Sequence, residues 1–166
     1  AEDGTLAFTG GATISVADAD NNLSSATLTV TNGVLNASNA GGATVTNNGT
    51  ATVTLTGSQA QINTALATLD FRPTADYNGA ATLTVVSSDG TASDTDTVTI
   101  TVSPVADVAN DNLTTNEDTA VTANVLTGTG GASADNFEGS PSVTATSTPA
   151  NGTVSFNAAG QVVYTP

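Results

Sequence analysis

Apolar and polar residues alternate along most of this 166-residue chain. The alternation is clearest in segments 24–31, 50–56, 81–85 and 94–102. In the last of these, Val98, Ile100 and Val102 share one face of an extended chain, and threonines occupy the other face. Successive side chains of a strand point to opposite faces, so the pattern predicts strands with one buried and one wet face. Clusters of Gly, Asn and Asp separate these segments, and short strands at this spacing predict an antiparallel β-sandwich.

One segment breaks the period of two. Ser58 and Gln61 have the spacing of a capping box, in which each side chain bonds to the backbone N–H of the other residue. The apolar residues from Ile62 to Leu69 then recur at i, i+3, i+4 and i+7, which places them on one helical face. The sequence therefore predicts a short helix over residues 59–68 that packs against the sandwich.

The chain also repeats itself. Glu2-Asp3-Gly4-Thr5-Leu6 matches Glu117-Asp118-Thr119-Ala120-Val121, an offset of 115 residues (2 to 117), and Phe71-Arg72-Pro73 matches Tyr164-Thr165-Pro166, an offset of 93 (73 to 166). Between these anchors, Thr31-Asn32-Gly33-Val34 resembles Asn151-Gly152-Thr153-Val154. Repetition favours an array of modules over one catalytic domain. The residues that follow Pro73 have no counterpart in the second copy, so we expect the second module to be truncated, either as a fragment or as a subunit completed by another chain.

These observations predict an all-β fold of tandem antiparallel β-sandwich modules, the first with one short helix and the second truncated. Residues 1–104 form the first module, residues 105–116 an acidic linker, and residues 117–166 a partial second module. In the second module we expect strands near 119–125, 142–146, 153–156 and 161–164, and an irregular loop over 128–139.

Charge and composition exclude several classes of function. The chain has fifteen acidic residues and one basic residue, Arg72. The resulting net charge of −14 repels nucleic acids and anionic membranes. The absence of Cys, His and Lys excludes disulfides, Ser-His-Asp triads and Schiff-base chemistry, and it makes zinc binding improbable. A hydrolase with a carboxylate pair is compatible with the residue types, but nothing places two acids in a cleft. No apolar run is long enough to span a membrane. We therefore expect no enzyme, no nucleic-acid partner and no membrane insertion.

The acidic residues cluster at turns, in register with the repeat. Turns from alternate connections of a sandwich lie at the same end, so these groups are expected to meet at the module junction and to bind Ca²⁺, which takes six to eight oxygen ligands. The candidate ligands are Glu2, Asp3, Asp18, Asp20, Asp89, Asp94, Asp96, Asp107, Asn110, Asp111, Glu117 and Asp118. The alternative is a solvated, self-repelling surface in which Asp89-Gly90 simply forms a hairpin turn, and Asp70 and Asp76 neutralise Arg72.

Several segments carry a family resemblance. They are Ile14–Asp20, Ile62–Gly79, Ser88–Gly90, Pro104–Asp107, Asn116–Val121, Pro149–Val154 and Val163–Pro166. Together they resemble the cadherin-like tandem repeats, similar to VCBS repeats, of large secreted RTX-type bacterial adhesins. The resemblance implies that the β-sandwich modules are of the cadherin or Ig-like kind, strung end to end at the cell surface and stiffened by calcium at their junctions. It also implies Asp107 and Asp111 as ligands from the linker.

The leading hypothesis is thus a structural extender of an extracellular adhesin or filament, whose partners are neighbouring repeats of the same or an identical chain. One alternative is a filament subunit, a homo-oligomer formed by strand exchange through open sheet edges of the second module. Another is a carbohydrate- or ice-binding module that uses the outward threonines at Thr50, Thr52, Thr54 and Thr56. Threonine is, however, a common exposed strand residue, and sugar sites usually need aromatic platforms.

Overall fold

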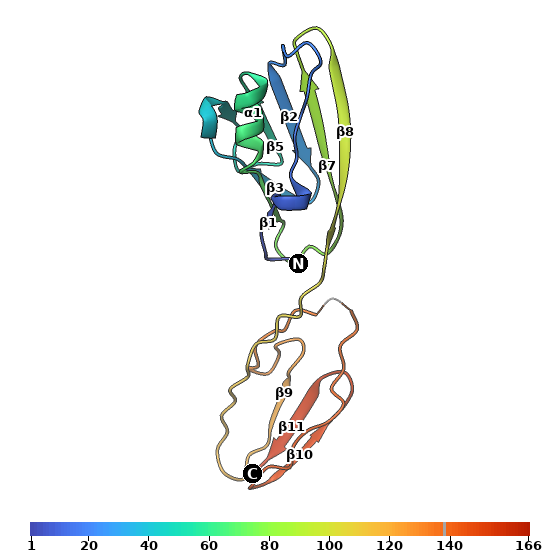
Figure 1. Ribbon diagram of the computed structural model, residues 1–166. Coiled ribbons are helices and arrows are strands. Elements are labelled where there is room, and N and C mark those ends of the chain that lie inside the picture. Colours follow the sequence, from blue (N-terminus) through green and yellow to red (C-terminus); the bar gives the residue numbers. More distant parts are fainter. Residues whose placement is uncertain (138) are drawn as a thin grey trace. The chain divides into compact units, whose positions relative to one another are not determined.

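The computed structural model describes residues 1–137 and 139–166. The chain divides into two compact units, Ala1–Pro104 (unit 1) and Val105–Pro166 (unit 2), which are coloured blue to yellow-green and yellow to red in Figure 1. Within the described residues, every strand pairing is antiparallel, and one α-helix interrupts the strands of unit 1. The predicted all-β fold of Ig-like sandwich modules is confirmed.

Unit 1 contains a large sheet of five strands in the order β4-β5-β2-β7-β8. The strands are β2 (Ser25–Val30), β4 (Thr44–Thr46), β5 (Thr52–Thr56), β7 (Gly79–Ser88) and β8 (Ser93–Val102). Four of them match the alternating segments of the sequence. β7 begins and ends beyond its predicted range because it pairs along its whole length with β8.

A small sheet of three strands, in the order β1-β6-β3, forms the second layer of unit 1. Its strands are β1 (Leu6–Ala7), β3 (Gly33–Asn36) and β6 (Asp70–Pro73). Short 3₁₀ turns, η1 (Gly10–Ala12) and η2 (Ala40–Gly42), follow β1 and β3. Leu6 and Leu35 lie on either side of Phe71, opposite it in the register.

The core of unit 1 lies between these two sheets. Leu28, Leu55 and Leu83 of the large sheet and Leu35 and Phe71 of the small sheet all have zero exposure and belong to one apolar cluster. Burying a side chain of this size stabilises the fold by about 1.5–3 kcal/mol relative to leaving it in water. This core consists mostly of aliphatic residues, in a chain whose residues are only 4% aromatic.

The predicted helix is confirmed as α1 (Gln59–Leu66), and both hydrogen bonds of the capping box are present. Ile62, Ala65 and Leu66 are buried, as the helical periodicity required. The helix ends two residues earlier than expected, because the N–H groups of Thr68 and Leu69 bond to carbonyls three residues back. This tight last turn still buries Leu69 and leads the chain directly into β6.

One face of β8 departs from the prediction. Ile100 and Val102 are buried at 7% and 4% exposure, but Val98 on the same face is 37% exposed. The reason is the length of the opposing layer, since β1 has only two residues and does not extend over this part of β8. The first half of β8 therefore lies beyond the core.

The part of unit 2 that the structure describes contains one sheet of three strands in the order β10-β11-β9. The strands are β9 (Val121–Asn124), β10 (Thr153–Phe156) and β11 (Gln161–Thr165). The expected strand at 142–146 is wrong: these residues form no strand, and Val143 makes one backbone bond, to Ala158, at 3.3 Å. Prolines at 141 and 149 flank this segment and cannot donate to a ladder. The described part of the expected loop 128–139 contains no strand, and residue 138 lies outside the described residues.

The sheet of unit 2 reproduces the small sheet of unit 1 in register. Leu6 pairs with Phe71 in unit 1, and Val121 pairs with Tyr164 in unit 2, which are the residues that the offsets of 115 and 93 equate. The turn before each first strand also repeats, with Asp3 at φ 56° and Asp118 at φ 57°. The sequence repeat is therefore a repeat of strand pairing.

The repeated Asn-Gly motif has a steric cause. A Cβ on Gly33 would collide with the carbonyl oxygen of Arg72, and a Cβ on Gly152 would collide with that of Thr165. These two carbonyls belong to equivalent positions of β6 and β11. Glycine is thus required where β3 and β10 enter their sheets, because the backbone of the neighbouring strand passes too close for a side chain.

The repeat provides a matched test of the core. Phe71 has zero exposure, whereas its counterpart Tyr164 is half-buried. We expect Phe71→Ala to lower the unfolding free energy of unit 1 by about 3–5 kcal/mol. Urea unfolding followed by the emission of Tyr77, the one tyrosine of unit 1, measures this. Tyr164→Ala is the control and should leave the Tyr77 transition unchanged; a shift of similar size would contradict separate cores.

Candidate functional site

The acidic residues of unit 1 gather at its two ends. β7 and β8 run antiparallel for ten residues each, which separates the ends by about 30 Å at roughly 3.3 Å per residue. Gly79 pairs with Val102 at one end, and Ser88 pairs with Ser93 at the other. We call the first the exit end, because the chain leaves unit 1 there, and the second the hairpin end. The expectation that all the acidic turns meet at one place does not hold for Asp18, Asp20 and Asp89, which lie at the hairpin end.

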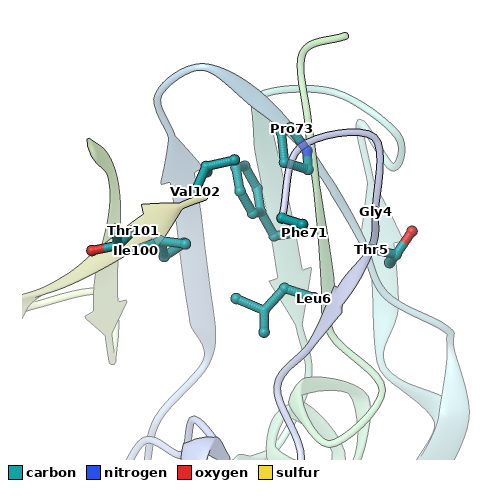
Figure 2. Close-up of a pocket in the computed structure, with 9 residues that line it drawn as sticks. Gly4, Thr5, Leu6, Phe71, Pro73, Ile100, Thr101 and Val102 are labelled. Atoms are coloured by element: carbon teal, nitrogen blue, oxygen red, sulfur yellow. The ribbon is translucent and has the colours of Figure 1, made fainter. Parts of the chain in front are cut away.

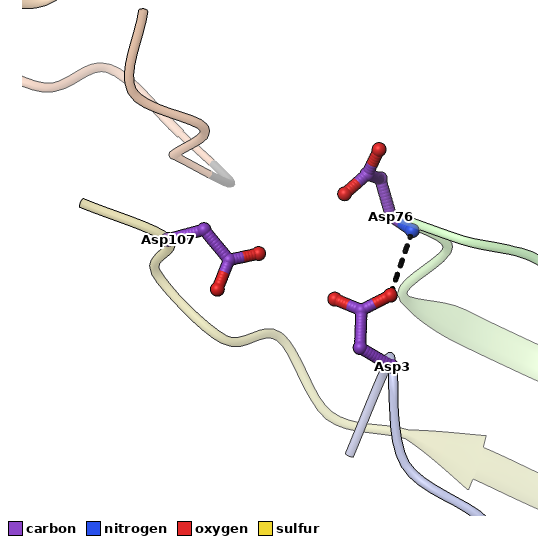
Figure 3. Close-up of side chains that lie close together, drawn as sticks. All are labelled: Asp3, Asp76 and Asp107. Atoms are coloured by element: carbon purple, nitrogen blue, oxygen red, sulfur yellow. Dashed lines mark hydrogen bonds between the residues drawn. The ribbon is translucent and has the colours of Figure 1, made fainter. Parts of the chain in front are cut away.

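Asp3 and Asp76 come together at the exit end. The Asp76 N–H donates to Asp3 Oδ1 at 3.4 Å, and both side chains are exposed (Figure 3). Both residues have left-handed backbone conformations, with φ of 56° and 59°. Such conformations are uncommon outside glycine and are best tolerated by Asp and Asn. Two tight turns thus hold two carboxylates side by side in solvent.

The N-terminal segment is attached to the last strand at this same end. The Glu2 N–H donates to the Ser103 carbonyl oxygen at 2.9 Å, and the Glu2 side chain is only 2% exposed. This bond fixes the turn that carries Asp3 beside the point where the chain leaves β8. Of the predicted ligands in unit 1, Glu2 and Asp3 are therefore the two at the exit end.

Sequence reasoning missed Asp76 as a possible ligand and assigned it to Arg72. In the structure, Asp76 lies three residues before the start of β7, and the antiparallel β7–β8 hairpin returns the end of β8 to the same place. A carboxylate just before the first strand of a hairpin therefore lies near the residues that follow the second strand. That reasoning needs the hairpin register, which alternation alone does not fix.

Asp107 is the first carboxylate after unit 1. It lies four residues beyond Ser103, and an extended chain spans at most about 3.6 Å per residue, so its Cα is within about 14 Å of that of Ser103. Its backbone belongs to unit 2, where it exchanges two hydrogen bonds with Asn136, at 3.0 and 2.9 Å. The carboxylate itself is exposed.

At the hairpin end, carboxylates mostly cap backbone turns. Asp18 Oδ1 accepts from the Asp20 N–H at 2.8 Å. Asp89 Oδ1 accepts from the N–H groups of Ala92 and Thr91 at 2.6 and 2.7 Å, and these bonds lower the pKa of Asp89. The Asp89-Gly90 turn thus has the structural role that the alternative interpretation assigned to it.

Asp94 and Asp96 lie on β8 itself, both exposed. Asp94 is opposite Ser87 and Asp96 is opposite Val85, away from the exit end. The structure does not bring them to Asp3 and Asp76.

The remaining predicted ligands are in unit 2. Asp111 Oδ1 accepts from the Ser133 N–H at 2.6 Å, which ties the linker to the loop that follows β9. Glu117 and Asp118 form the turn before β9, and Asn110 lies exposed in the linker. Asp135, which was not predicted, accepts from the Ala109 N–H at 2.7 Å. In unit 2 two carboxylates therefore hold the linker against the loop.

Three of the threonines proposed for sugar or ice binding, Thr50, Thr52 and Thr54, use their hydroxyls within the sheet. Thr29 and Thr52 hydroxyls lie 3.2 Å apart, and those of Thr27 and Thr54 lie 3.4 Å apart. The Thr50 hydroxyl lies 2.8 and 2.9 Å from the backbone carbonyl oxygens of Asn47 and Thr52, the two acceptors for its one proton. Such cross-strand pairs stabilise a sheet, and they occupy the groups that a ligand would need.

Comparison with known proteins gives one family match. Residues 102–166 match the family model described as the bacterial Ig domain. This part of the chain is thus Ig-like, and bacterial Ig-like domains are often parts of extracellular proteins. The match supports an Ig-like bacterial domain, and it does not extend to cadherin-like or VCBS repeats specifically. No curated protein and no solved structure matches the chain. Among the described residues, no helix has the length and apolar character needed to cross a membrane.

The lowered pKa of Asp89 gives a prediction of pH dependence. The backbone N–H groups of Ala92 and Thr91 favour the charged carboxylate in the folded state, so its stabilisation is present above the unfolded-state pKa and is lost as the pH falls through the folded-state pKa. We expect Asp89→Ala to lower the melting temperature of unit 1 at neutral pH and to have a smaller effect in acid. Thermal unfolding by circular dichroism across the acid range measures this, with Asp20→Ala as the control; a difference independent of pH would contradict the linkage.

Proposed function

We propose that this chain is a non-enzymatic structural extender of a bacterial extracellular protein, such as a surface adhesin or filament, and that Ca²⁺ bound at the exit end of unit 1 stiffens the junction with the following module. The observation that carries the proposal is the pair Asp3 and Asp76, held side by side where the chain passes from one β unit to the next.

The tandem architecture supports a spacer. The small sheet of unit 1 recurs in unit 2 with the same pairing, and residues 102–166 match the bacterial Ig domain. A spacer needs repetition, solubility and stiffness. Repetition is provided by the sheets, and solubility by the net charge of −14.

Calcium would supply the stiffness. The exposed carboxylates of Asp3 and Asp76, on two adjoining turns, repel each other when no cation is present. Carboxylate oxygens of this kind are preferred ligands of Ca²⁺. The tether of four residues keeps Asp107 within reach of the same place. An ion that recruits Asp107 to Asp3 and Asp76 would restrict the linker, because one end of the tether would then be fixed to unit 1.

The first prediction of this proposal concerns calcium removal. At a calcium concentration of 100 times Kd, binding adds about 2.7 kcal/mol to the unfolding free energy. We therefore expect a chelator to lower the melting temperature of unit 1 and to shorten the mean particle length in small-angle X-ray scattering. Asp3→Asn and Asp76→Asn should each remove most of the response to calcium, since Asn retains the left-handed turn and loses the charge. Asp107→Asn should remove the change in length.

The matched control is Asp20→Asn, which removes one exposed carboxylate at the hairpin end. It should retain the full calcium response. If chelator changes neither the melting temperature nor the scattering of the wild-type chain, the calcium mechanism is wrong. If Asp20→Asn weakens the response as much as Asp3→Asn does, general charge screening explains the effect.

A second candidate function, a self-associating filament subunit, is favoured by the apolar face of unit 2. By the strand register, one face of its sheet carries only apolar residues: Val121, Ala123, Val154, Phe156, Val162 and Tyr164. The equivalent residues of unit 1 are buried by the large sheet, apart from Leu6. Of these six residues in unit 2, Ala123 is the one that is buried, and Phe156 is 41% exposed. A second copy that covers this face would complete a sandwich.

This candidate predicts concentration-dependent association. In sedimentation velocity we expect oligomers of the wild-type chain that Phe156→Asp converts to monomers, because a charge on the apolar face opposes its burial. Thr153→Asp, on the opposite face of β10, is the control and should leave association unchanged. If the wild-type chain is monomeric at all concentrations, the filament-subunit hypothesis is wrong and the structural extender is the candidate that stays.

A further inference from the structure

A furrow runs along the open side of unit 1, between the N-terminal segment and β8. Its wider part has a volume of about 390 Å³ and is lined by residues of segment 6–14 and by residues 98–101 of β8. A narrower part of about 130 Å³ shares Leu6 and Ile100 with the first and continues to Phe71 and Val102. Figure 2 shows these four apolar side chains turned toward this narrower part. The floor of the furrow is thus continuous with the core.

β8 is an edge strand. It lies last in the order of the large sheet and pairs with β7, its one strand partner among the described residues. The outer edge of such a strand presents backbone N–H and C=O groups that can pair with another extended chain. Leu6 and Val98, on the two walls of the furrow, are 40% and 37% exposed. An added strand would find apolar side chains beside a free sheet edge.

The side chains on the furrow side of β8 change from acidic to apolar along the strand. Val98 is opposite Leu83, Asp96 opposite Val85, and Asp94 opposite Ser87. Residues directly opposite each other share a face, so Asp94 and Asp96 continue the row of Val98 and Ile100. The row is therefore apolar toward the exit end and acidic toward the hairpin end, where Asp89 adds a further carboxylate.

We propose that this furrow binds an extended segment of another, basic protein, which adds to β8 as an antiparallel strand. The segment places aliphatic residues opposite Val98 and Ile100, and Lys or Arg opposite Asp94 and Asp96. Strand addition draws affinity from backbone hydrogen bonds and specificity from alternate side chains. Antiparallel pairing is more stable per residue than parallel pairing. Because an antiparallel segment meets Ile100 first and Asp94 last, its aliphatic residues come before its basic residues in its own sequence.

The charge of this chain favours a basic protein over a second copy as the occupant of the furrow. A second copy of this chain carries fifteen acidic residues and a single basic residue, Arg72, which is already in β6 at the centre of the small sheet. Its strands offer no basic end, and its net charge repels the acidic half of β8. Inward-pointing charges on an edge strand discourage pairing with like chains, and here they leave pairing with a basic segment favourable.

The test uses the full chain and a labelled peptide, Val-Thr-Val-Thr-Lys-Thr-Lys, followed by fluorescence anisotropy at low salt. We expect binding, and protection of β8 amides in hydrogen exchange when the peptide is added. Replacing both peptide lysines by Glu should abolish binding. Asp94→Asn with Asp96→Asn should weaken binding about tenfold, because two exposed ion pairs are lost. Val98→Lys, which places a positive charge in the furrow, should weaken binding at any salt concentration.

Asp118→Asn with Asp111→Asn is the matched control: it removes the same charge from unit 2 and should leave peptide affinity unchanged. Several outcomes overturn the proposal. They are no binding of the lysine peptide, equal binding of the Glu peptide, and binding without protection of β8, which would indicate diffuse attraction to an acidic protein. Self-association of the wild-type chain that Val98→Lys abolishes would assign the furrow to a second copy.

Discussion

The pairing of one central strand with two short neighbours is the constraint on which both units depend. In unit 1 the strand is β6, and Phe71 at its middle faces Leu6 on one side and Leu35 on the other, with no exposure to solvent. In unit 2 the strand is β11, and Tyr164 occupies the equivalent place. A slip of one residue would turn every apolar side chain of this sheet to the opposite face. The register is therefore conserved between the units although their loops differ in length.

The units differ in what covers that sheet. In unit 1 the five-stranded sheet lies over it, and the leucines of both layers form one dry cluster. Among the described residues of unit 2, Ala123 is the one hydrophobic residue that is buried. The linker and loops are held by Asp111 and Asp135 through backbone hydrogen bonds. Unit 1 is thus stabilised by burial of large side chains, and unit 2 relies more on polar contacts, which contribute only about 0.5–1.5 kcal/mol each.

Alternation predicted four strands of the large sheet, capping and helical periodicity predicted the helix, and repetition predicted the matched ends, because each depends on a local pattern or on similar segments. The short strands β1, β3, β4 and β6 were not predicted, since two to four residues show little alternation. Three further features were not predictable in this way. The exposure of Val98 depends on how far the opposing layer extends. The failure of 142–146 to form a strand reflects its flanking prolines and its few apolar positions. The meeting of Asp3 and Asp76 depends on the hairpin register, because residues 73 positions apart approach only once β7 and β8 have paired.

The distribution of charge then separates acids that cap turns from the acids at the exit end and along β8. Asp89, Asp111 and Asp135 each accept short backbone hydrogen bonds, so a cation would have to compete with the turns that these residues hold. Asp3 and Asp76 are different, since one bond between them uses a single carboxylate oxygen and a backbone N–H. Asp94 and Asp96 differ again, because they continue an apolar row on an open edge. The same excess of acid therefore caps turns at the hairpin end and in unit 2. Under our two proposals, it would also attract a cation at the exit end and select a basic partner along β8.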